Sequence, residues 1–127
     1  MIQIDPNSPV PLNDQIKAGF KGLVAKGLLR PGDQMPSIRG LATSLKVNPN
    51  TVARAFRELS LEGFIESQRG NGNYVSDMAK RQAKDNLEDV RERLREALRL
   101  AKRGGLPWSE ISALMQEFKG KKNELLI

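Results

Sequence analysis

Three polar side chains in the middle of the sequence could recognise a nucleic acid. Asn50, Arg54 and Arg57 recur at helical spacing and would share one face of a helix. The opposite face would carry only apolar residues: Val52, Ala55, Phe56 and Leu59. An Asn amide can pair with adenine through two hydrogen bonds, and an Arg guanidinium can pair with guanine or with phosphate. The pattern therefore predicts a helix that buries one side and offers hydrogen-bonding groups to a nucleic acid on the other.

These side chains also have a simpler interpretation. Arg54 could pair with Glu58 four residues later on a solvated face, which stabilises a helix by only ~0.3–0.5 kcal/mol. Arg57 could be a solvated charge or lie near a phosphate. Composition alone does not decide, although 21 Lys and Arg against 15 Asp and Glu give a formal net charge of +6. That balance favours a polyanionic partner.

Two residue types that serve most catalytic and metal sites are missing. The chain has no His and no Cys, which excludes disulfides and thiolate metal sites and removes the commonest general base. Carboxylates such as Asp85, Glu88 and Asp89 would favour at most a hard cation. We therefore expect no enzyme activity, no cofactor and no metal. No apolar run approaches the roughly 20 residues of a membrane span, and the N-terminal residues lack signal-peptide features, so a cytoplasmic location away from membranes is expected.

A first helix is predicted over about residues 10–28, after an extended arm over residues 1–9. Apolar residues recur there at helical spacing, and Gly27 would end the helix. Gly19 and Gly22 inside the helix weaken it, and close packing against a neighbouring segment is one explanation for them.

Two further helices follow closely. Ser37 can cap a helix that ends near Leu45, and Asn48 with Pro49 can start another that runs to about Glu62. A short helix, a short turn and a helix with a basic face form a helix-turn-helix arrangement, whose second helix can enter the major groove.

The segment after these helices has the pattern of a β-hairpin, which would be the wing of a winged helix. Residues 64–67 and 74–75 are partly apolar and flank a turn of Gly and Asn residues at 68–73. The predicted fold class is mostly α with this small β-hairpin. A winged helix-turn-helix domain would occupy residues 1–77, and a two-helix C-terminal dimerisation segment would occupy residues 78–127.

The C-terminal segment has a different pattern from the first domain. A long charged helix is expected from about Met78 to Arg103, and Leu106–Pro107 opens a last helix that frays from Gly120. Apolar residues form a seam on the first helix and a stripe on the second: Leu87, Val90, Leu94, Ala97, Leu98 and Ala101, then Trp108, Ile111, Leu114, Met115 and Phe118. Two helices cannot bury such faces alone, so a second copy of the chain is the simplest partner. The stripe could instead line an effector pocket.

Five ordered blocks between residues 9 and 76 form a specific signature. They read PLNDQI at 11–16, LRPGDQMPSIR at 29–39, VNPNTVARAFREL at 47–59, EGFI at 62–65 and RGNG at 69–72. On these blocks the sequence resembles the GntR family of bacterial regulators, and within it the short YtrA-type branch. Asn13 stands where the family often has an aromatic residue, and Gly40 where it more often has an acidic one. Neither position is expected to read DNA.

The resemblance implies a regulator that binds a two-fold operator in double-stranded DNA through two winged helices. It places the family's DNA-contact positions on Arg39, Asn48, Asn50, Thr51, Arg54, Arg69 and Gly70. Arg69 would reach the minor groove or a phosphate, or be only the solvated flank of the hairpin turn. The basic run Lys80, Arg81 and Lys84 could touch phosphates or be a solvated face.

Three functions remain open on the sequence. The first is a homodimeric, sequence-specific regulator, such as a repressor on a palindromic operator, with an unknown small-molecule effector possible. The second is an architectural DNA binder, with strong salt dependence and little preference among sequences. The third is an adaptor that docks a protein on its winged helix, for which Arg39 and Arg54 would be dispensable.

Overall fold

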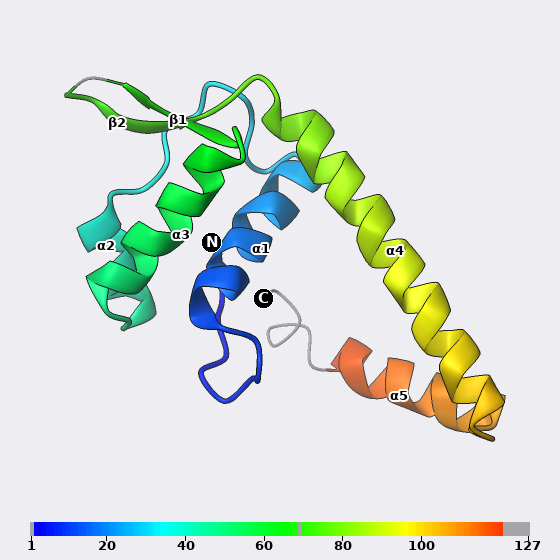
Figure 1. Cartoon of the computed structure of the whole chain (residues 1–127). Coiled ribbons are helices and arrows are strands. Elements are labelled where there is room, and N and C mark those ends of the chain that lie inside the picture. The colour runs from blue at the N-terminus through cyan, green and yellow to red at the C-terminus, as the bar shows by residue number, and fades with distance from the viewer. Residues whose placement is uncertain (1, 69, 121–127) are drawn as a thin grey trace.

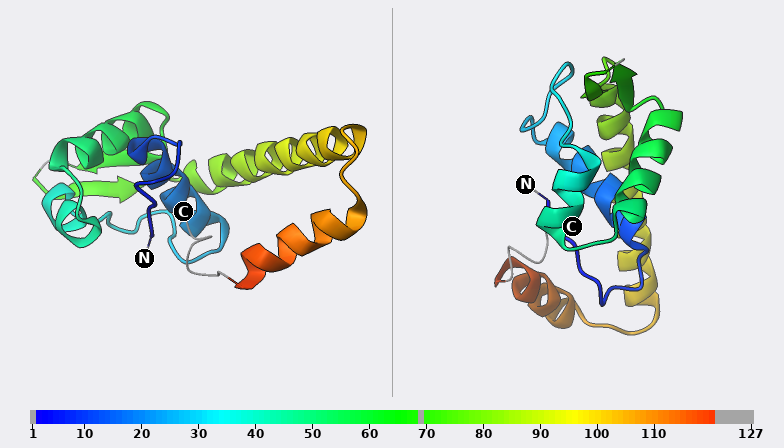
Figure 2. Two further views of the ribbon diagram at one scale, coloured as in Figure 1. Left: turned by 90° about the horizontal axis from the view of Figure 1, so that it is seen from below. Right: turned by 90° about the vertical axis from the view of Figure 1, so that its left-hand side faces the viewer.

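The computed structural model describes residues 2–68 and 70–120 and arranges them as helices around one hairpin (Figure 1). The elements are α1 (Leu12–Ala25), α2 (Ile38–Leu45), α3 (Pro49–Leu61), β1 (Ile65–Gln68), β2 (Gly72–Val75), α4 (Ala79–Arg103) and α5 (Trp108–Gly120). The first three helices and the hairpin form one body, α4 leads away from it, and α5 turns back (Figure 2). This confirms the predicted fold class, a winged helix-turn-helix domain followed by two C-terminal helices.

The predicted start signals position the second and third helices. The Ser37 side chain accepts a hydrogen bond from the backbone N–H of Gly40, and that of Asn48 accepts one from Asn50. The turn between the helices is tight because Lys46 adopts a left-handed conformation, with φ at 58°, after the last residue of α2. The α2–α3 unit therefore has the predicted helix-turn-helix form.

Other boundaries differ from the sequence prediction by a few residues. The first helix begins at Leu12, because Pro11 is its N-cap with an extended ψ of 142° and also disfavours a helical conformation at Val10. It ends at Ala25, and Gly27 beyond it has a φ of 76° that a right-handed helix cannot continue. The strands pair from Ile65↔Val75 to Gln68↔Gly72, so the hairpin is longer than predicted and its turn is shorter.

The core lies between α1 and α3. Phe20 of α1 and Phe56 of α3 meet edge to face, with ring centroids 5.9 Å apart and planes at 76°. Ile16 and Val52, both fully buried, pack in the same cluster. An aromatic pair of this geometry contributes ~0.5–1.5 kcal/mol beyond its buried area. The buried face of α3 is thereby fixed against α1, and its opposite face is left to solvent.

The N-terminal arm is clamped onto α1. Both the oxygen and the nitrogen of the Gln15 side-chain amide form hydrogen bonds. The oxygen accepts from the Asp5 N–H, and the nitrogen donates to the Asp5 and Val10 carbonyls. Ile2 is buried against Gly19, where an added Cβ would lie 2.9 Å from the Ile2 side chain. Close packing therefore accounts for Gly19, as predicted. It does not account for Gly22, where an added Cβ would meet no neighbouring segment within 4 Å.

The first turns of α4 are part of the winged-helix core. Ala79 and Ala83 are buried in the same cluster as the residues of α1 and α3. The Gln82 side chain donates to the Glu62 carbonyl at 2.8 Å, and the Ser76 hydroxyl donates to the Gly63 carbonyl. The direction in which α4 leaves the domain is therefore set by packing and hydrogen bonds. Beyond these turns Leu87, Val90 and Leu94 of the apolar seam are exposed, and Leu98 and Ala101 are half-buried.

Candidate nucleic-acid interface

The N-terminal end of α2, the N-terminal end of α3 and the tip of the hairpin all lie on one side of the molecule (Figures 1 and 2). The buried face of α3 consists of Val52, Ala55, Phe56 and Leu59, as the periodicity predicted. The outward face carries Asn50 and Arg54, both exposed. A helix flanked by a second helix start and a wing matches the arrangement by which a winged helix enters a groove of DNA.

The residues predicted to contact DNA are distributed over these three elements. Arg39 is exposed in the first turn of α2, Asn48 and Asn50 are exposed at the start of α3, and Thr51 beside them is half-buried. At the tip of the hairpin Gly70 is exposed with a φ of 74°. Arg69 lies outside the described residues. The contacts themselves stay a prediction.

Arg54 forms an ion pair with Glu58, and most of its side chain remains exposed. Its Nε lies 3.6 Å from a carboxylate oxygen of Glu58, while 66% of its side chain is exposed. The ion pair that the sequence offered as an alternative is therefore present. It uses only the Nε edge of the guanidinium. Among the described residues the two terminal nitrogens have no acceptor and remain open to a base or a phosphate.

Glu58 in turn is fixed from α1, which the sequence did not predict. The Asn13 amide donates to the Glu58 carboxylate at 2.6 Å, and Lys17 lies 3.9 Å from its other oxygen. Asn13 is buried, so the departure from the family pattern at this position has a structural role. No local pattern could have revealed it, because the two residues are 45 positions apart.

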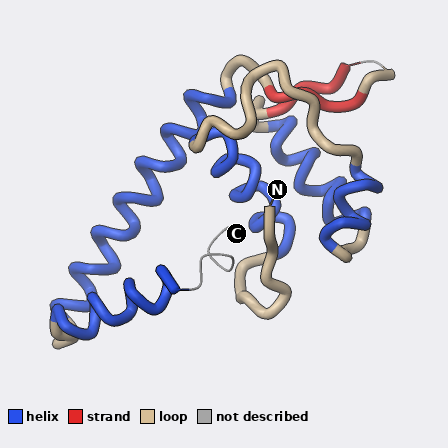
Figure 3. Tube along the Cα trace, turned by 180° about the vertical axis from the view of Figure 1, so that it is seen from behind, coloured by secondary structure: helices blue, strands red, loops and turns tan. Residues whose placement is uncertain are grey.

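The wing is anchored by the segment before α2. The Met35 N–H donates to the Asn73 carbonyl at 2.8 Å, and the Val75 N–H donates to the Asp33 carbonyl at 2.9 Å. Between them Gln34 bridges to β2, and its side-chain amide donates to the Asn71 carbonyl at 2.8 Å. Figure 3 shows this connector running beside the hairpin. Gln34 is thus a positioning residue for the wing tip that the sequence did not identify.

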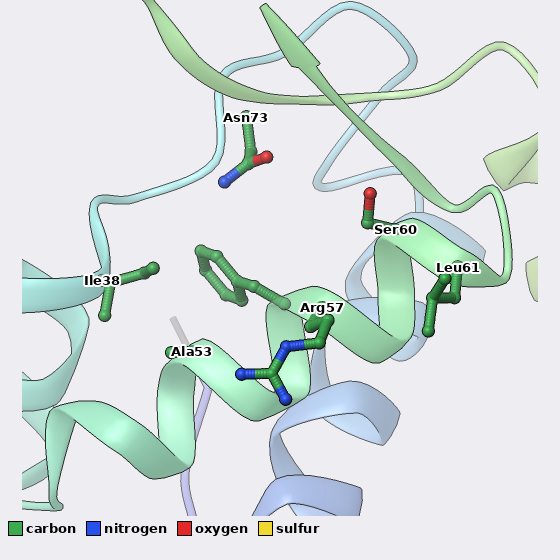
Figure 4. Close-up of a pocket in the computed structure, with 7 residues that line it drawn as sticks. Ile38, Ala53, Arg57, Ser60, Leu61 and Asn73 are labelled. Carbon is green, nitrogen blue, oxygen red and sulfur yellow. The ribbon is translucent and has the colours of Figure 1, made fainter.

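A cavity of about 360 Å³ lies where α2, α3 and β2 meet. Figure 4 shows Ile38 of α2 and Asn73 of β2 pointing toward the flank of α3 that carries Ala53 and Ser60. Arg57 lies on its rim, next to the outward face of α3. The cavity lies between α3 and the wing and hollows this surface.

An ion-pair cluster ties α1 to the end of α3. Lys17 and Lys21 lie 2.6 Å and 2.7 Å from the two carboxylate oxygens of Glu62. Partial burial alone would raise the pKa of Glu62, but hydrogen bonds from the two lysines outweigh it and the pKa lies below its ordinary value. Burial likewise acts to lower the pKa of Lys17, and its contact with Glu62 leaves it raised.

This cluster predicts how stability depends on pH. Because the pKa of Glu62 is lower in the folded chain than in the unfolded one, its ionisation stabilises the fold above about pH 4.3, and the stabilisation is lost as the pH falls further. We expect the free energy of unfolding in urea to fall less steeply between about pH 5 and pH 3 in Glu62→Gln than in the parent chain. Glu66→Gln, at an exposed position on β1, is the control. Equal slopes in all three proteins would contradict the prediction.

The described residues suggest neither a metal site nor a membrane span. Within them no group of three or more acidic side chains is arranged to hold a metal ion, and Asp85, Glu88 and Asp89 form no such group. No helix among them combines the length and the apolar composition needed to cross a bilayer.

Known proteins resemble this chain in sequence and in fold. The transcriptional repressor YtrA of Bacillus subtilis (strain 168) is 39% identical over 130 residues, covering 98% of this chain and 100% of that protein. The structure of YtrA from Sulfolobus acidocaldarius, a GntR-family transcription factor, is 39% identical, with a TM-score of 0.59 over 76% of this chain and 96% of that one. A transcriptional regulator from Oenococcus oeni has a TM-score of 0.68 and 25% identity over 91% and 96% of the two chains.

The family model for bacterial regulatory proteins of the gntR family matches residues 12–75, from the start of α1 to the end of β2. The matched region contains the helix-turn-helix and the hairpin on which the predicted resemblance rests, and that prediction is confirmed. With the near full-length identity to the YtrA repressor, it shows that the chain belongs to the GntR family of bacterial transcription regulators, which bind DNA.

Proposed function

We propose that this regulator is a repressor that binds a palindromic operator as a homodimer. The exposed apolar face of its two C-terminal helices carries the proposal. Leu94 and Trp108 are 59% and 60% exposed. Ile111 is buried and Leu98 is half-buried, but five more large apolar residues of this face are exposed: Leu87, Val90, Leu114, Met115 and Phe118. An apolar surface of this extent on two otherwise charged helices needs a partner. A second copy of the chain, related by a two-fold axis, supplies the same apolar surface in return.

Dimerisation would give the DNA contacts their geometry. Two recognition helices related by a two-fold axis bind half-sites about one helical turn, or ~34 Å, apart on a palindrome. We assign the contacts to Arg39, Asn48, Asn50, Thr51, Arg54, Arg69 and Gly70. Occupying such an operator blocks transcription, and the YtrA relative is named a repressor. A cytoplasmic location, where the bacterial chromosome lies, belongs to the same proposal.

The proposal is tested by selecting binding sites from random duplexes with the full chain at near-physiological salt. We expect enrichment of a palindrome that is bound about 10³-fold or more tightly than scrambled DNA. If the affinity for DNA falls as the salt concentration rises and no sequence is enriched, the protein is instead an architectural DNA binder. Absence of any DNA binding would point to a protein-docking adaptor. Either of these outcomes overturns the proposal.

A further inference from the structure

A second basic surface lies where α1 and α4 pack together, apart from the proposed DNA contacts. A pocket of about 380 Å³ opens there between the C-terminal end of α1 and the first turns of α4. Its basic residues are Lys26, Lys80 and Lys84, and its other lining residues are Val24, Ala25, Gly27 and Leu87. Three lysines from two segments that are distant in sequence therefore line one pocket together with apolar residues.

The charge of this pocket is not balanced within the described part of the chain. None of the three lysines makes an ion pair there, although Asp77, just before α4, and Glu88 on α4 lie within four residues of Lys80 and Lys84 in the sequence. Lys17 and Lys21, further back on α1, are by contrast both paired with Glu62. Like charges held around one cavity repel each other, so an anion bound among them would relieve that repulsion.

The position of the pocket argues against a role in contacting the operator. In Figure 1 the end of α1 and the start of α4 lie on the side of the winged-helix body away from α2 and the tip of the hairpin. A duplex that lies along the starts of α2 and α3 and the wing tip would leave the pocket accessible.

We propose that this pocket binds a small, soluble, phosphate-bearing molecule with an apolar body, which acts as the effector of the regulator. Lysine ammonium groups bind phosphate as point charges, and three of them suit a doubly charged group. Val24 and Ala25 line the apolar part of the pocket, and the volume falls within the range of small-molecule sites. The effector role rests on the proposed function as an operator-binding repressor.

The pocket is placed to couple ligand binding to DNA binding. One wall belongs to α1 in the core of the DNA-binding domain, and the other belongs to α4, which continues into the proposed dimer interface. A ligand that contacts both walls favours one angle between them. Its effect on operator affinity equals, by linkage, the effect of the operator on the affinity for the ligand.

The first test is calorimetric titration of the full chain with phenyl phosphate at constant ionic strength, without DNA. We expect saturable binding with one site per chain, weakened at least ~10-fold in the double variant Lys80→Gln/Lys84→Gln. The control Arg81→Gln/Arg93→Gln removes the same charge from α4 outside the pocket and should bind as the parent chain does. No saturable binding, or equal weakening in both double variants, overturns the site.

The second test repeats operator titrations with and without saturating phenyl phosphate. We expect the ligand to change operator affinity at least ~3-fold in the parent chain and not in Lys80→Gln/Lys84→Gln. If that variant loses operator affinity or dimerisation without ligand, the lysines serve DNA or the second copy, and the proposal is wrong. Because the calorimetric test contains no DNA, failure to select an operator leaves its result intact, so the two proposals fail separately.

Discussion

Leu94→Asp is expected to give a folded monomer whose affinity for the selected operator is ~10²–10⁴-fold lower than that of the parent chain. Leu94 lies in the apolar seam of α4 and is 59% exposed in the single chain, so an aspartate costs the monomer little. In a two-fold dimer the same position would bury an unpaired charge, which an apolar interface does not accommodate. In a dimer, binding at one half-site raises the effective concentration of the second DNA-binding domain at the other half-site. A monomer lacks this gain, so its affinity for the operator is lower.

The matched control is Leu100→Asp, the same substitution on the same helix. Leu100 is 68% exposed and lies about 120° around the helix from Leu94, outside the seam. Light scattering after size-exclusion chromatography and fluorescence anisotropy with labelled operator measure the two effects. A dimeric Leu94→Asp protein would refute the seam as the interface. Dissociation of both variants would show that the interface is not confined to the seam.

Arg54→Ala is expected to weaken operator binding by ~1–3 kcal/mol and to relax the preference at one base pair of each half-site. The side chain is mostly solvated and its ion pair within the described residues is with Glu58, so the free energy of unfolding should change by no more than the ~0.5 kcal/mol of an exposed ion pair. Titration against the operator and against single-base variants of it separates base reading from a general loss.

Arg57→Ala is the comparison on the same helix. Arg57 is exposed on the rim of the cavity beside the wing, and its removal should weaken binding to all sequences alike and lower the salt dependence. If Arg54→Ala behaves in the same way, Arg54 contacts phosphate. If Arg54→Ala has no effect on any duplex, the recognition face of α3 has been assigned wrongly.

The sequence predicted the elements of the fold whose causes are local. Side-chain caps at Ser37 and Asn48 mark the starts of α2 and α3, and apolar periodicity identifies the buried face of α3. The hairpin follows from a turn that contains glycines with positive φ at positions 70 and 72. These signals act over a few residues, so they can be read along the chain without knowing how the elements pack.

The sequence did not predict the contacts that join distant segments. Asn13 reaches Glu58 across 45 residues, and Gln34 reaches Asn71 across 37. These pairs support α3 and the wing, but no local sequence pattern links the two members of either pair. The pocket between α1 and α4 was missed for the same reason. Its lysines at positions 80 and 84 were noticed only as part of a basic run, while Lys26 lies at the end of α1, far away in the sequence.

Because Ala79 and Ala83 are buried in the core, the start of α4 moves together with the DNA-binding domain. With 25 residues, α4 is about 37 Å long. A rotation of about 10° at one end of a rod of that length displaces the other end by ~6 Å, nearly two base-pair steps of 3.4 Å. The distance between half-sites that a dimer tolerates is therefore set by the stiffness of this joint. Operators whose half-sites are moved apart by a single base pair should be discriminated without any change in a base contact.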